Sequence, residues 1–500
     1  MPSSLHTLSA FTLQERVASG ELSAVEIART ALDRIHAHDG AVGAYLHIDG
    51  EGALAQAAMV DRARAAGEAL GPLAGVPIAL KDNLCVRGIP ATCASKILEG
   101  WIAPYDATVV TRLREAGAVV LGKTNMDEFA MGSSNETSAC KLVHNPWDLS
   151  RAPGGSSGGS AASVAAGMAT MSLGSDTGGS VRQPAAFCGL VALKPTYGRV
   201  SRYGLIAFAS SLDQIGPFTR DVRDCAIVSE VISGRDPRDA TSVDVPVGSY
   251  TGELGRDVRG LRVGVVRSTL TDGCEPGVVA AVERAIETLR SLGCEIVDVA
   301  LPTAEHAVSA YYIVAPAECS SNLARFDGMR FGPRVESPDL LETYGKTRAL
   351  FGKEVRRRIM LGTYVLSAGY YDAFYAKAQK ARTLIARDYA AAFERCDVVL
   401  TPTAPSVAFG LGAKTKNPLE MYLADIFTLP PSLAGLPAIN VPCGLSEGLP
   451  VGLQLTAKAF HEGTLFRVSS AFEAATDHHT HRAALFTTGA PLARAEGASR

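Results

Sequence analysis

Residues 154–182 carry the sequence GGSSGGSAASVAAGMATMSLGSDTGGSVR, in which 15 of the 27 positions from 154 to 180 are glycine or serine. Such a composition is typical of a flexible linker. A linker, however, has no use for the compact, helix-competent apolar block at residues 161–168, which lies inside the Gly/Ser frame. The stretch therefore predicts a tightly packed loop-helix-loop site.

The flanking segments alternate between short apolar runs and amphipathic stretches. Residues 71–83, GPLAGVPIALKDN, predict a buried strand that ends at Lys81. A helical periodicity over 107–116 is followed by the strand-like run AVVL, and residues 261–300 predict a strand-helix-strand unit. The run CDVVLTP predicts another buried strand. This alternation predicts an α/β fold with a large mixed, mostly parallel sheet covered by helices on both faces.

We expect a single domain over residues 1–485. It begins with N-terminal helices over 8–40, where Ser23 and Glu26 form a capping-box pattern. The polar segment 234–260 predicts a surface excursion between two halves, and residues 486–500 predict a loose tail.

The overall composition excludes several classes of protein. A net charge of −3 is unusual for a chain that binds nucleic acid by itself, so any RNA role would need a partner. There is neither an apolar run of about 20 residues to span a membrane nor a secretory signal. The ten cysteines form no C-x-x-C pair and the histidines do not cluster, which predicts free thiols, no metal site and a cytoplasmic location.

Three short stretches fit known motif patterns in residue type alone. Gly117–Thr124 fits the phosphate-loop pattern, but its variable residues AVVL favour a strand over a loop. Residues 154–158 fit the G-x-S-x-G nucleophile elbow, which must follow a hydrophobic strand, whereas LSRAP precedes it here. Residues 138–141 fit S-x-x-K, a pattern short enough for chance. We therefore expect neither a nucleotide site nor an esterase elbow at these positions.

Amide cleavage requires a nucleophile, a base and donors for the developing oxyanion. No histidine lies in the Gly/Ser-rich loops, but a desolvated lysine can serve as a neutral base, and Lys81 ends an apolar run. The consecutive glycines before Ser180 would let backbone N–H groups converge on one point. Taken separately, Lys81 also fits a plain strand end, and residues 174–182 also fit an anion-binding nest or a turn.

Together these residues resemble the amidase signature family, whose pattern pairs GGSSGGS, here 154–160, with GSDTGGSVR, here 174–182, and with a lysine that matches Lys81 in ALKDN. The resemblance implies the amidase-signature fold and a Ser-cisSer-Lys triad. Ser180 would be the nucleophile, and Ser156, on a cis peptide bond, would relay protons to Lys81. The oxyanion hole would be formed by the N–H groups of Thr177, Gly178, Gly179 and Ser180, while Asp176 and Arg182 would hold the loop.

Within the family, the chain is most similar to the A subunits of tRNA-dependent amidotransferases. The similarity is dense at residues 123–139, 197–218, 320–328, 357–375 and 433–444. It implies that Tyr311, Arg358 and Asp425 contact the substrate, since an arginine can hold the α-carboxylate of glutamine and an aspartate its α-ammonium. Tyr312, Arg356 and Arg357 are neighbouring alternatives.

The resemblance also implies a division of labour. This chain would hydrolyse glutamine without a cofactor of its own, and amidotransferase subunits B and C would complete the complex. The partner would use ATP and Mg²⁺ to amidate a misacylated tRNA, Glu-tRNA(Gln) or Asp-tRNA(Asn). Two alternatives remain: a stand-alone amidase for aryl, fatty or urea-type amides, and a non-catalytic scaffold, against which the intact triad argues.

Overall fold

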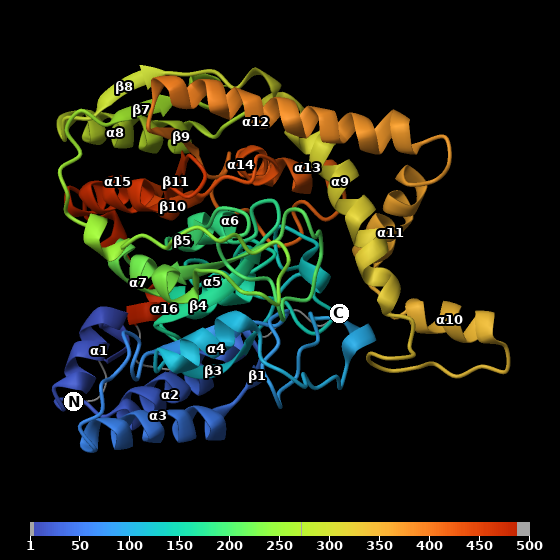
Figure 1. The fold of residues 1–500 in the computed structure, drawn as a ribbon, viewed down its shortest axis with the longest axis horizontal. Coiled ribbons are helices and arrows are strands. Elements are labelled where there is room, and N and C mark those ends of the chain that lie inside the picture. The colour runs from blue at the N-terminus through green and yellow to red at the C-terminus, as the bar shows by residue number, and fades with distance from the viewer. Residues whose placement is uncertain (1–4, 272, 488–500) are drawn as a thin grey trace.

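One sheet of eleven strands runs through the computed structural model, which describes residues 5–271 and 273–487 (Figure 1). The strands are β1 (Tyr45–Ile48), β2 (Pro77–Lys81), β3 (Val119–Thr124), β4 (Met171–Asp176), β5 (Val191–Lys194), β6 (Gln214–Thr219), β7 (Arg262–Val265), β8 (Glu295–Asp298), β9 (Val398–Pro402), β10 (Ala438–Ser446) and β11 (Leu449–Ala457). Their order is β1-β3-β2-β4-β6-β5-β10-β11-β9-β7-β8. The α/β class and the mixed sheet are thus confirmed.

The prediction of a mostly parallel sheet is wrong. Among the ten neighbouring strand pairs of the described sheet, four are parallel: β2 with β3, β2 with β4, β7 with β8, and β7 with β9. The antiparallel strands β6, β5, β10 and β11 join these two parallel parts. In the β10–β11 hairpin, Glu447 and Gly448 have φ of 53° and 77°, as a two-residue type I′ turn requires.

Helices surround the sheet over its whole length. They are α1 (Ala10–Ala18), α2 (Ala24–Val42), α3 (Gly50–Ala65), α4 (Thr108–Glu115), α5 (Gly158–Ala165), α6 (Arg182–Cys188), α7 (Val222–Ile232), α8 (Pro276–Ser291), α9 (Ala307–Asn322), α10 (Leu340–Arg348), α11 (Lys353–Val365), α12 (Lys377–Arg395), α13 (Pro418–Tyr422), α14 (Leu429–Leu433), α15 (Glu462–Ala474) and α16 (Ala484–Thr487). In the described residues, no helix is long and apolar enough to cross a membrane.

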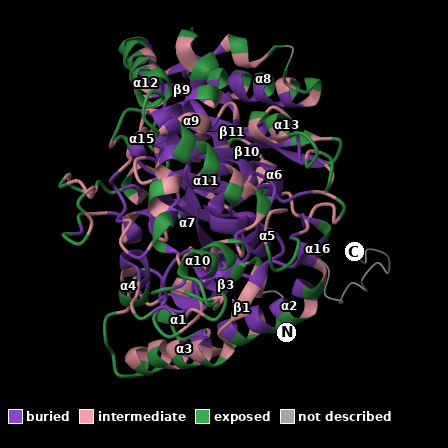
Figure 2. Ribbon diagram, turned by 90° about the vertical axis from the view of Figure 1, so that its right-hand side faces the viewer, coloured by how far each residue is buried: buried purple, intermediate pink, exposed green. Residues whose placement is uncertain are grey.

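Alternate residues of β5 show that helices cover both faces of the sheet. Val191 and Leu193 pack in a cluster with α7, α8 and α15, whereas Ala192, between them, packs with α5 and α6. Side chains of neighbouring strand residues point to opposite faces, so these two helix groups lie on opposite sides. At the centre of the molecule the chain is buried, while α10 and much of α11 are exposed (Figure 2).

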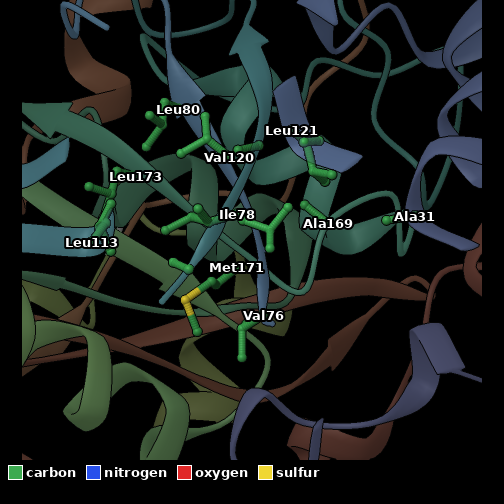
Figure 3. Close-up of a cluster of buried hydrophobic side chains, with 14 of the residues drawn as sticks. Ala31, Val76, Ile78, Leu80, Leu113, Val120, Leu121, Ala169, Met171 and Leu173 are labelled. Carbon is green, nitrogen blue, oxygen red and sulfur yellow. The ribbon is translucent and has the colours of Figure 1, made fainter. Parts of the chain in front are cut away.

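The strand that ends at Lys81 forms as predicted and lies in the core. Ile78 and Leu80 of β2 pack against Val120, Met171 and other apolar side chains of the neighbouring strands (Figure 3). All five residues of β2 are buried. Because β2 pairs in parallel with both β3 and β4, its last residue is held between two fixed backbones.

Local sequence signals account for the N-terminal part. Ser23 accepts from the backbone of Glu26, and Glu26 accepts in return, so α2 begins with the predicted capping box. The phosphate-loop look-alike forms β3 after α4, as the run AVVL favoured, and Lys123 makes a buried ion pair with Asp82. The prediction of a loop-helix-loop at 154–180 is half right: α5 is the helix, but residues 171–176 form a central strand.

The C-terminal boundary differs from the prediction. Residues 484–487 form α16, and Phe486 is buried, with Arg220 over its ring at 5.3 Å, so the packed chain extends beyond residue 485. The rest of the predicted tail, 488–500, lies outside the described residues.

Within residues 234–260 the only helical structure is the short turn Thr251–Glu253, in keeping with the predicted excursion. That residues 1–485 form one domain stays a prediction, which the continuous sheet supports.

We expect Gly159→Ala to lower the free energy of unfolding by about 1–3 kcal/mol, because a Cβ at this position would lie 2.4 Å from the carbonyl oxygen of Asn125 and 2.6 Å from that of Ala44. Gly40→Ala in α2 is the control. Its Cβ would meet nothing within 4 Å, so it should raise stability by about 0.5–1 kcal/mol. Urea unfolding measures both, and equal stabilities would contradict the close approach of α5.

Candidate active site

Lys81, at the end of β2, is fully buried, and its amine is surrounded by hydroxyl groups. Its Nζ donates to Ser156 Oγ at 2.8 Å, to Ser157 Oγ at 2.8 Å and to Ser175 Oγ at 2.9 Å. Burial lowers the pKa of Lys81 to about 7, although the carboxylates of Asp127 and Asp176 oppose that shift. A substantial neutral fraction of the amine is therefore available near pH 7.

Ser156 lies on a tight turn between β3 and α5. The peptide bond between Gly155 and Ser156 is cis, as the family resemblance implied. Asp127 holds the turn: its N–H donates to the Ser156 carbonyl oxygen at 3.1 Å, and a Cβ on Gly155 would lie 2.1 Å from its carboxylate. The turn therefore needs glycine at 155, and it directs the Ser156 hydroxyl to Lys81.

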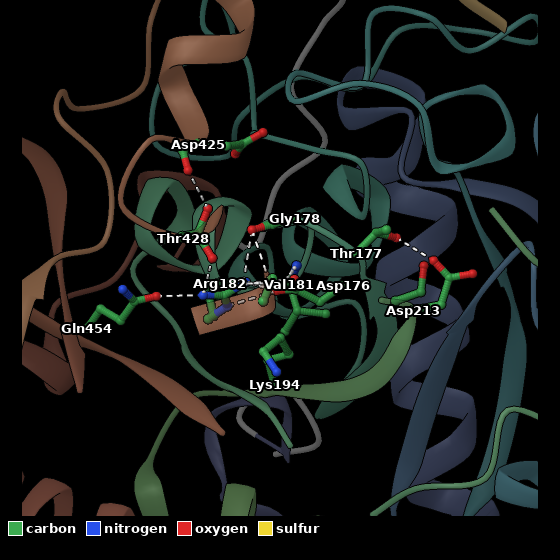
Figure 4. Close-up of polar contacts among 12 residues, drawn as sticks. Asp176, Thr177, Gly178, Val181, Arg182, Lys194, Asp213, Asp425, Thr428 and Gln454 are labelled. Atoms are coloured by element: carbon green, nitrogen blue, oxygen red, sulfur yellow. Dashed lines mark hydrogen bonds and ion pairs between the residues drawn. The ribbon is translucent and has the colours of Figure 1, made fainter. Parts of the chain in front are cut away.

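A buried ion pair holds the loop that contains Ser180. Asp176 accepts from Arg182 Nη2 at 2.9 Å and Nε at 3.0 Å, and neither side chain is exposed. Arg182 also donates to Gln454 Oε1 at 2.7 Å and to the Thr428 carbonyl oxygen at 2.9 Å (Figure 4). This matches the loop-holding role expected for the pair, and it ties the loop to β11 and to the segment before α14.

Ser180 follows the two glycines at the start of this loop. It is 6 % exposed, and its hydroxyl makes no hydrogen bond to any described residue. In particular, no hydrogen bond joins it to Ser156 in the described structure. Gln183, three residues later, accepts from the Gly155 N–H at 2.9 Å, which brings the loop against the Ser156 turn. The Ser180 hydroxyl is thus unengaged, on a loop that contacts the Ser156 turn through Gln183.

Backbone N–H groups are available in the same loop. Those of Gly178, Gly179 and Ser180 donate to no acceptor in the part of the chain that the structure describes. Asp213 fixes the neighbouring Thr177, whose hydroxyl donates to this carboxylate at 2.7 Å (Figure 4). Free N–H groups at consecutive positions suit an anionic oxygen.

Asp425 and Tyr311 contact the two glycines. A Cβ on Gly179 would lie 3.0 Å from Asp425 Oδ1, and one on Gly178 would lie 3.0 Å from Tyr311 Cζ. Burial raises the pKa of Asp425 to about 7, and although Ser133 donates to Oδ2, the buried Oδ1 has no hydrogen-bond partner among the described residues. An unpaired buried carboxylate oxygen is a binding site for a donor.

Arg358, on α11, is buried and accompanied by aromatic rings. Its Nε donates to Glu354 at 2.9 Å, and its guanidinium lies 5.1 Å from the ring centroid of Tyr312 and 5.6 Å from that of Phe208. The alternatives differ: Arg356 is exposed, the Arg357 side chain is 40 % exposed, and Tyr312 stacks on Tyr422. A cavity of about 340 Å³ is lined by Ser133, Glu354, Arg358 and Tyr422, among others.

Sequence reasoning missed five residues of this site. Ser157 and Ser175 accept from Lys81, and Asn83 donates to Ser175. Ser133 donates to Asp425, and Gln183 joins the two loops. Three of them had a signal, since Ser157 and Ser175 lie inside the two motifs and Asn83 ends ALKDN. The other two required the fold, because their partners are 28 and 292 residues away.

Comparison with known proteins shows the family of the chain. The model of the family Amidase matches residues 26–466. The chain belongs to the amidase family. The A subunit of the glutamyl-tRNA(Gln) amidotransferase from Moorella thermoacetica is 59 % identical to this amidase over 96 % of this chain and 98 % of its own length.

Two solved structures of this amidase's relatives share its fold. The A subunit of the Thermotoga maritima glutamyl-tRNA(Gln) amidotransferase is 44 % identical, with 94 % of this chain and 95 % of that chain covered and a TM-score of 0.78. The peptide amidase of Stenotrophomonas maltophilia is 33 % identical over 94 % of this chain and 96 % of its own, with a TM-score of 0.79. The expected fold and family are therefore confirmed.

The lowered pKa of Lys81 predicts a pH-dependent stability. Between pH 7 and 10.5 the unfolded chain, in which the lysine has a pKa of 10.5, binds more protons than the folded protein. The stability of the wild type should therefore rise with pH relative to Lys81→Met, by up to about 1.4 kcal/mol per pH unit. Urea unfolding at pH 7, 8 and 9 measures the difference, and parallel curves would show that Lys81 is not desolvated as described.

Proposed function

We propose that this amidase is the glutaminase subunit of a tRNA-dependent amidotransferase. It hydrolyses glutamine to glutamate and ammonia, and the ammonia amidates Glu-tRNA(Gln) or Asp-tRNA(Asn) on a partner. The observation that carries the proposal is the unpaired oxygen of Asp425, which lies against the Ser180 loop and suits a substrate ammonium.

The proposed reaction uses the three triad residues in turn. Neutral Lys81 takes the Ser156 proton while Ser156 takes that of Ser180, whose oxygen attacks the carboxamide carbon of glutamine. The N–H groups of Thr177, Gly178, Gly179 and Ser180 stabilise the oxyanion. The proton returns through Ser156 to the leaving nitrogen, so ammonia departs and an acyl-enzyme remains. Water then repeats the sequence, releasing glutamate and restoring Ser180.

Glutamine is held at its other end by two charged side chains. Asp425 accepts the α-ammonium, and Arg358 donates to the α-carboxylate, with its Nε already fixed by Glu354. Tyr311, which lies against Gly178, is the third residue that we assign to the substrate. An ammonium beside Asp425 favours its ionised form, which offsets the effect of burial on the pKa of this carboxyl.

The partners follow from the chemistry that this chain does not supply. Activation of a tRNA-linked carboxylate needs ATP and Mg²⁺, which we assign to the partner, with subunits B and C completing a cytoplasmic heterotrimer. The near-neutral net charge of −3 is consistent with tRNA being held by the partner. No cofactor is assigned to this chain.

A stand-alone amidase is the alternative function. The peptide amidase with a similar fold shows that the family also includes such enzymes. The Asp425–Arg358 pair favours glutamine, since a site for apolar amides has no use for two buried charges. Turnover of apolar amides by the isolated chain, with no glutaminase in the assembled complex, would establish the alternative instead.

Ser180→Ala should reduce glutamine hydrolysis by roughly 10³-fold or more, because the acyl-enzyme can no longer form. Ammonia release by the complex measures this loss. Ser163→Ala is the matched control, since Ser163 is also buried but donates to Ser160 O in α5. Retained turnover in Ser180→Ala would remove Ser180 from the mechanism.

Asp425→Asn and Arg358→Lys should each raise the KM for glutamine about 10–100-fold, because each loses a charged hydrogen bond to the substrate. Arg357→Lys is the control for Arg358, being its half-exposed neighbour, paired with the same Glu354. Steady-state kinetics with glutamine measures all three. If Arg357→Lys raised the KM as much as Arg358→Lys does, the contact to the carboxylate would have to be reassigned.

A further inference from the structure

The surroundings of Lys81 fit the charged form of its amine. Three hydroxyl oxygens, from Ser156, Ser157 and Ser175, lie 2.8–2.9 Å from Nζ. A lysine ammonium has three N–H donors and no acceptor, whereas the neutral amine has two donors and a lone pair. The hydroxyl cage, which we define as Ser156, Ser157 and Ser175, therefore supplies one short hydroxyl acceptor for each N–H of the ammonium, and the Ser175 carbonyl oxygen is a longer fourth contact at 3.3 Å.

Ser175 comes from β4, whereas Ser156 and Ser157 lie on the turn before α5, and like Ser157 it lies outside the relay. Asn83 supports it from behind: Nδ2 of Asn83 donates to Ser175 Oγ at 2.9 Å. Asn83 is itself buried, and its Oδ1 has no hydrogen-bond partner among the described residues. A buried unpaired acceptor costs folding free energy, so stability alone does not account for an asparagine at this position.

We propose that Ser175 and Asn83 are positioning residues that stabilise the protonated Lys81 during turnover, with Ser175 as the third acceptor and Asn83 fixing its orientation. This inference rests on the proposed function only in taking Lys81 as the proton acceptor. It assigns the two residues a role in the energy of the proton-transfer step, not in substrate binding.

The physical reason is the charge that the reaction creates. When the Ser180 O–H bond breaks, its proton passes to Ser156, whose own proton passes to Lys81, and a positive charge appears in a buried site. Burial disfavours that charge, and hydrogen bonds to it are the compensation. The other groups that bear on it are the carboxyls of Asp127, Asp176 and Asp213 and the thiol of Cys93, all of which stay in place when Ser175 or Asn83 is changed.

The test uses a fluorophosphonate, which reacts with an activated serine whatever the natural substrate. The Ser180 oxygen forms a bond to phosphorus, the P–F bond breaks, fluoride leaves, and the proton goes through Ser156 to Lys81. The labelling rate of Ser180, followed by mass spectrometry from pH 5 to 9, gives the pH of half-maximal rate. The probe carries no ammonium, so Asp425 has no ligand to bind.

Ser175→Ala should lower the pH of half-maximal labelling by about one to two units, because the ammonium loses the hydroxyl acceptor at 2.9 Å and keeps only the longer contact to the carbonyl oxygen of residue 175. It should also slow the maximal rate about tenfold, since a weaker base accepts the proton less readily. Asn83→Asp should move the midpoint in the opposite direction, to higher pH, because a carboxylate replaces the amide near the ammonium. A purely structural role would slow labelling without shifts of opposite sign.

Ser172→Ala is the matched control. Ser172 lies on the same strand and is as buried as Ser175, but its hydroxyl donates to Ser160 O at 2.8 Å; its midpoint should equal that of the wild type. An unshifted midpoint in both Ser175→Ala and Asn83→Asp, with Ser180 labelled in the wild type, would overturn this inference alone. If Ser175→Ala fails to fold, Asn83→Asp decides. No labelling of wild-type Ser180 would overturn the proposed function and this inference with it.

Discussion

The site depends on one amine kept out of water and still able to accept a proton. Removing a lysine from water favours its neutral form, which is what a base near pH 7 must be. The same burial would make the ammonium unattainable if nothing received its N–H groups. In this amidase the two demands are met together, because the apolar strand β2 carries Lys81 into the core and three hydroxyl oxygens lie around its Nζ.

The second constraint is the buried pair of Asp176 and Arg182. Neither side chain reaches solvent, and removing one partner of such a pair commonly costs about 3–5 kcal/mol because the other charge is left unpaired. Arg182 also binds Thr428, Ser432 and Gln454, which lie 246 to 272 residues further along the chain. One guanidinium therefore holds the Ser180 loop and joins it to the segment that contains Asp425.

Chemistry and recognition come from different parts of the fold. The residues that we propose for amide cleavage lie on the central strands and on the turns that follow them, whereas those that we propose for glutamine come from α9, α11 and the turn Leu423–Asp425. The helical side of the molecule, at the right of Figure 1, can thus change while the centre stays the same. This arrangement accounts for a fold that also occurs in a peptide amidase.

The sequence by itself determined the local elements and the chemistry of the motifs. The capping box at Ser23, the strand that ends at Lys81 and the strand within the false phosphate loop all follow from short-range patterns, because hydrogen bonding and apolar periodicity act within a few residues. The triad, in contrast, was implied by the resemblance of the two serine motifs and Lys81 to a known family, and it remains a proposal. The α/β class also followed, from the alternation of predicted strands and helices.

Only the tertiary structure decided which distant residues meet. Strand direction is set by pairing across the whole chain, which is why the sheet is less parallel than predicted and why residues 171–176 are a central strand. The third hydroxyl around Lys81, the amide behind it and the serine that donates to Asp425 each lie 92 to 292 residues from the residue they contact. No local pattern encodes such contacts, because they exist only after the apolar strands have packed together.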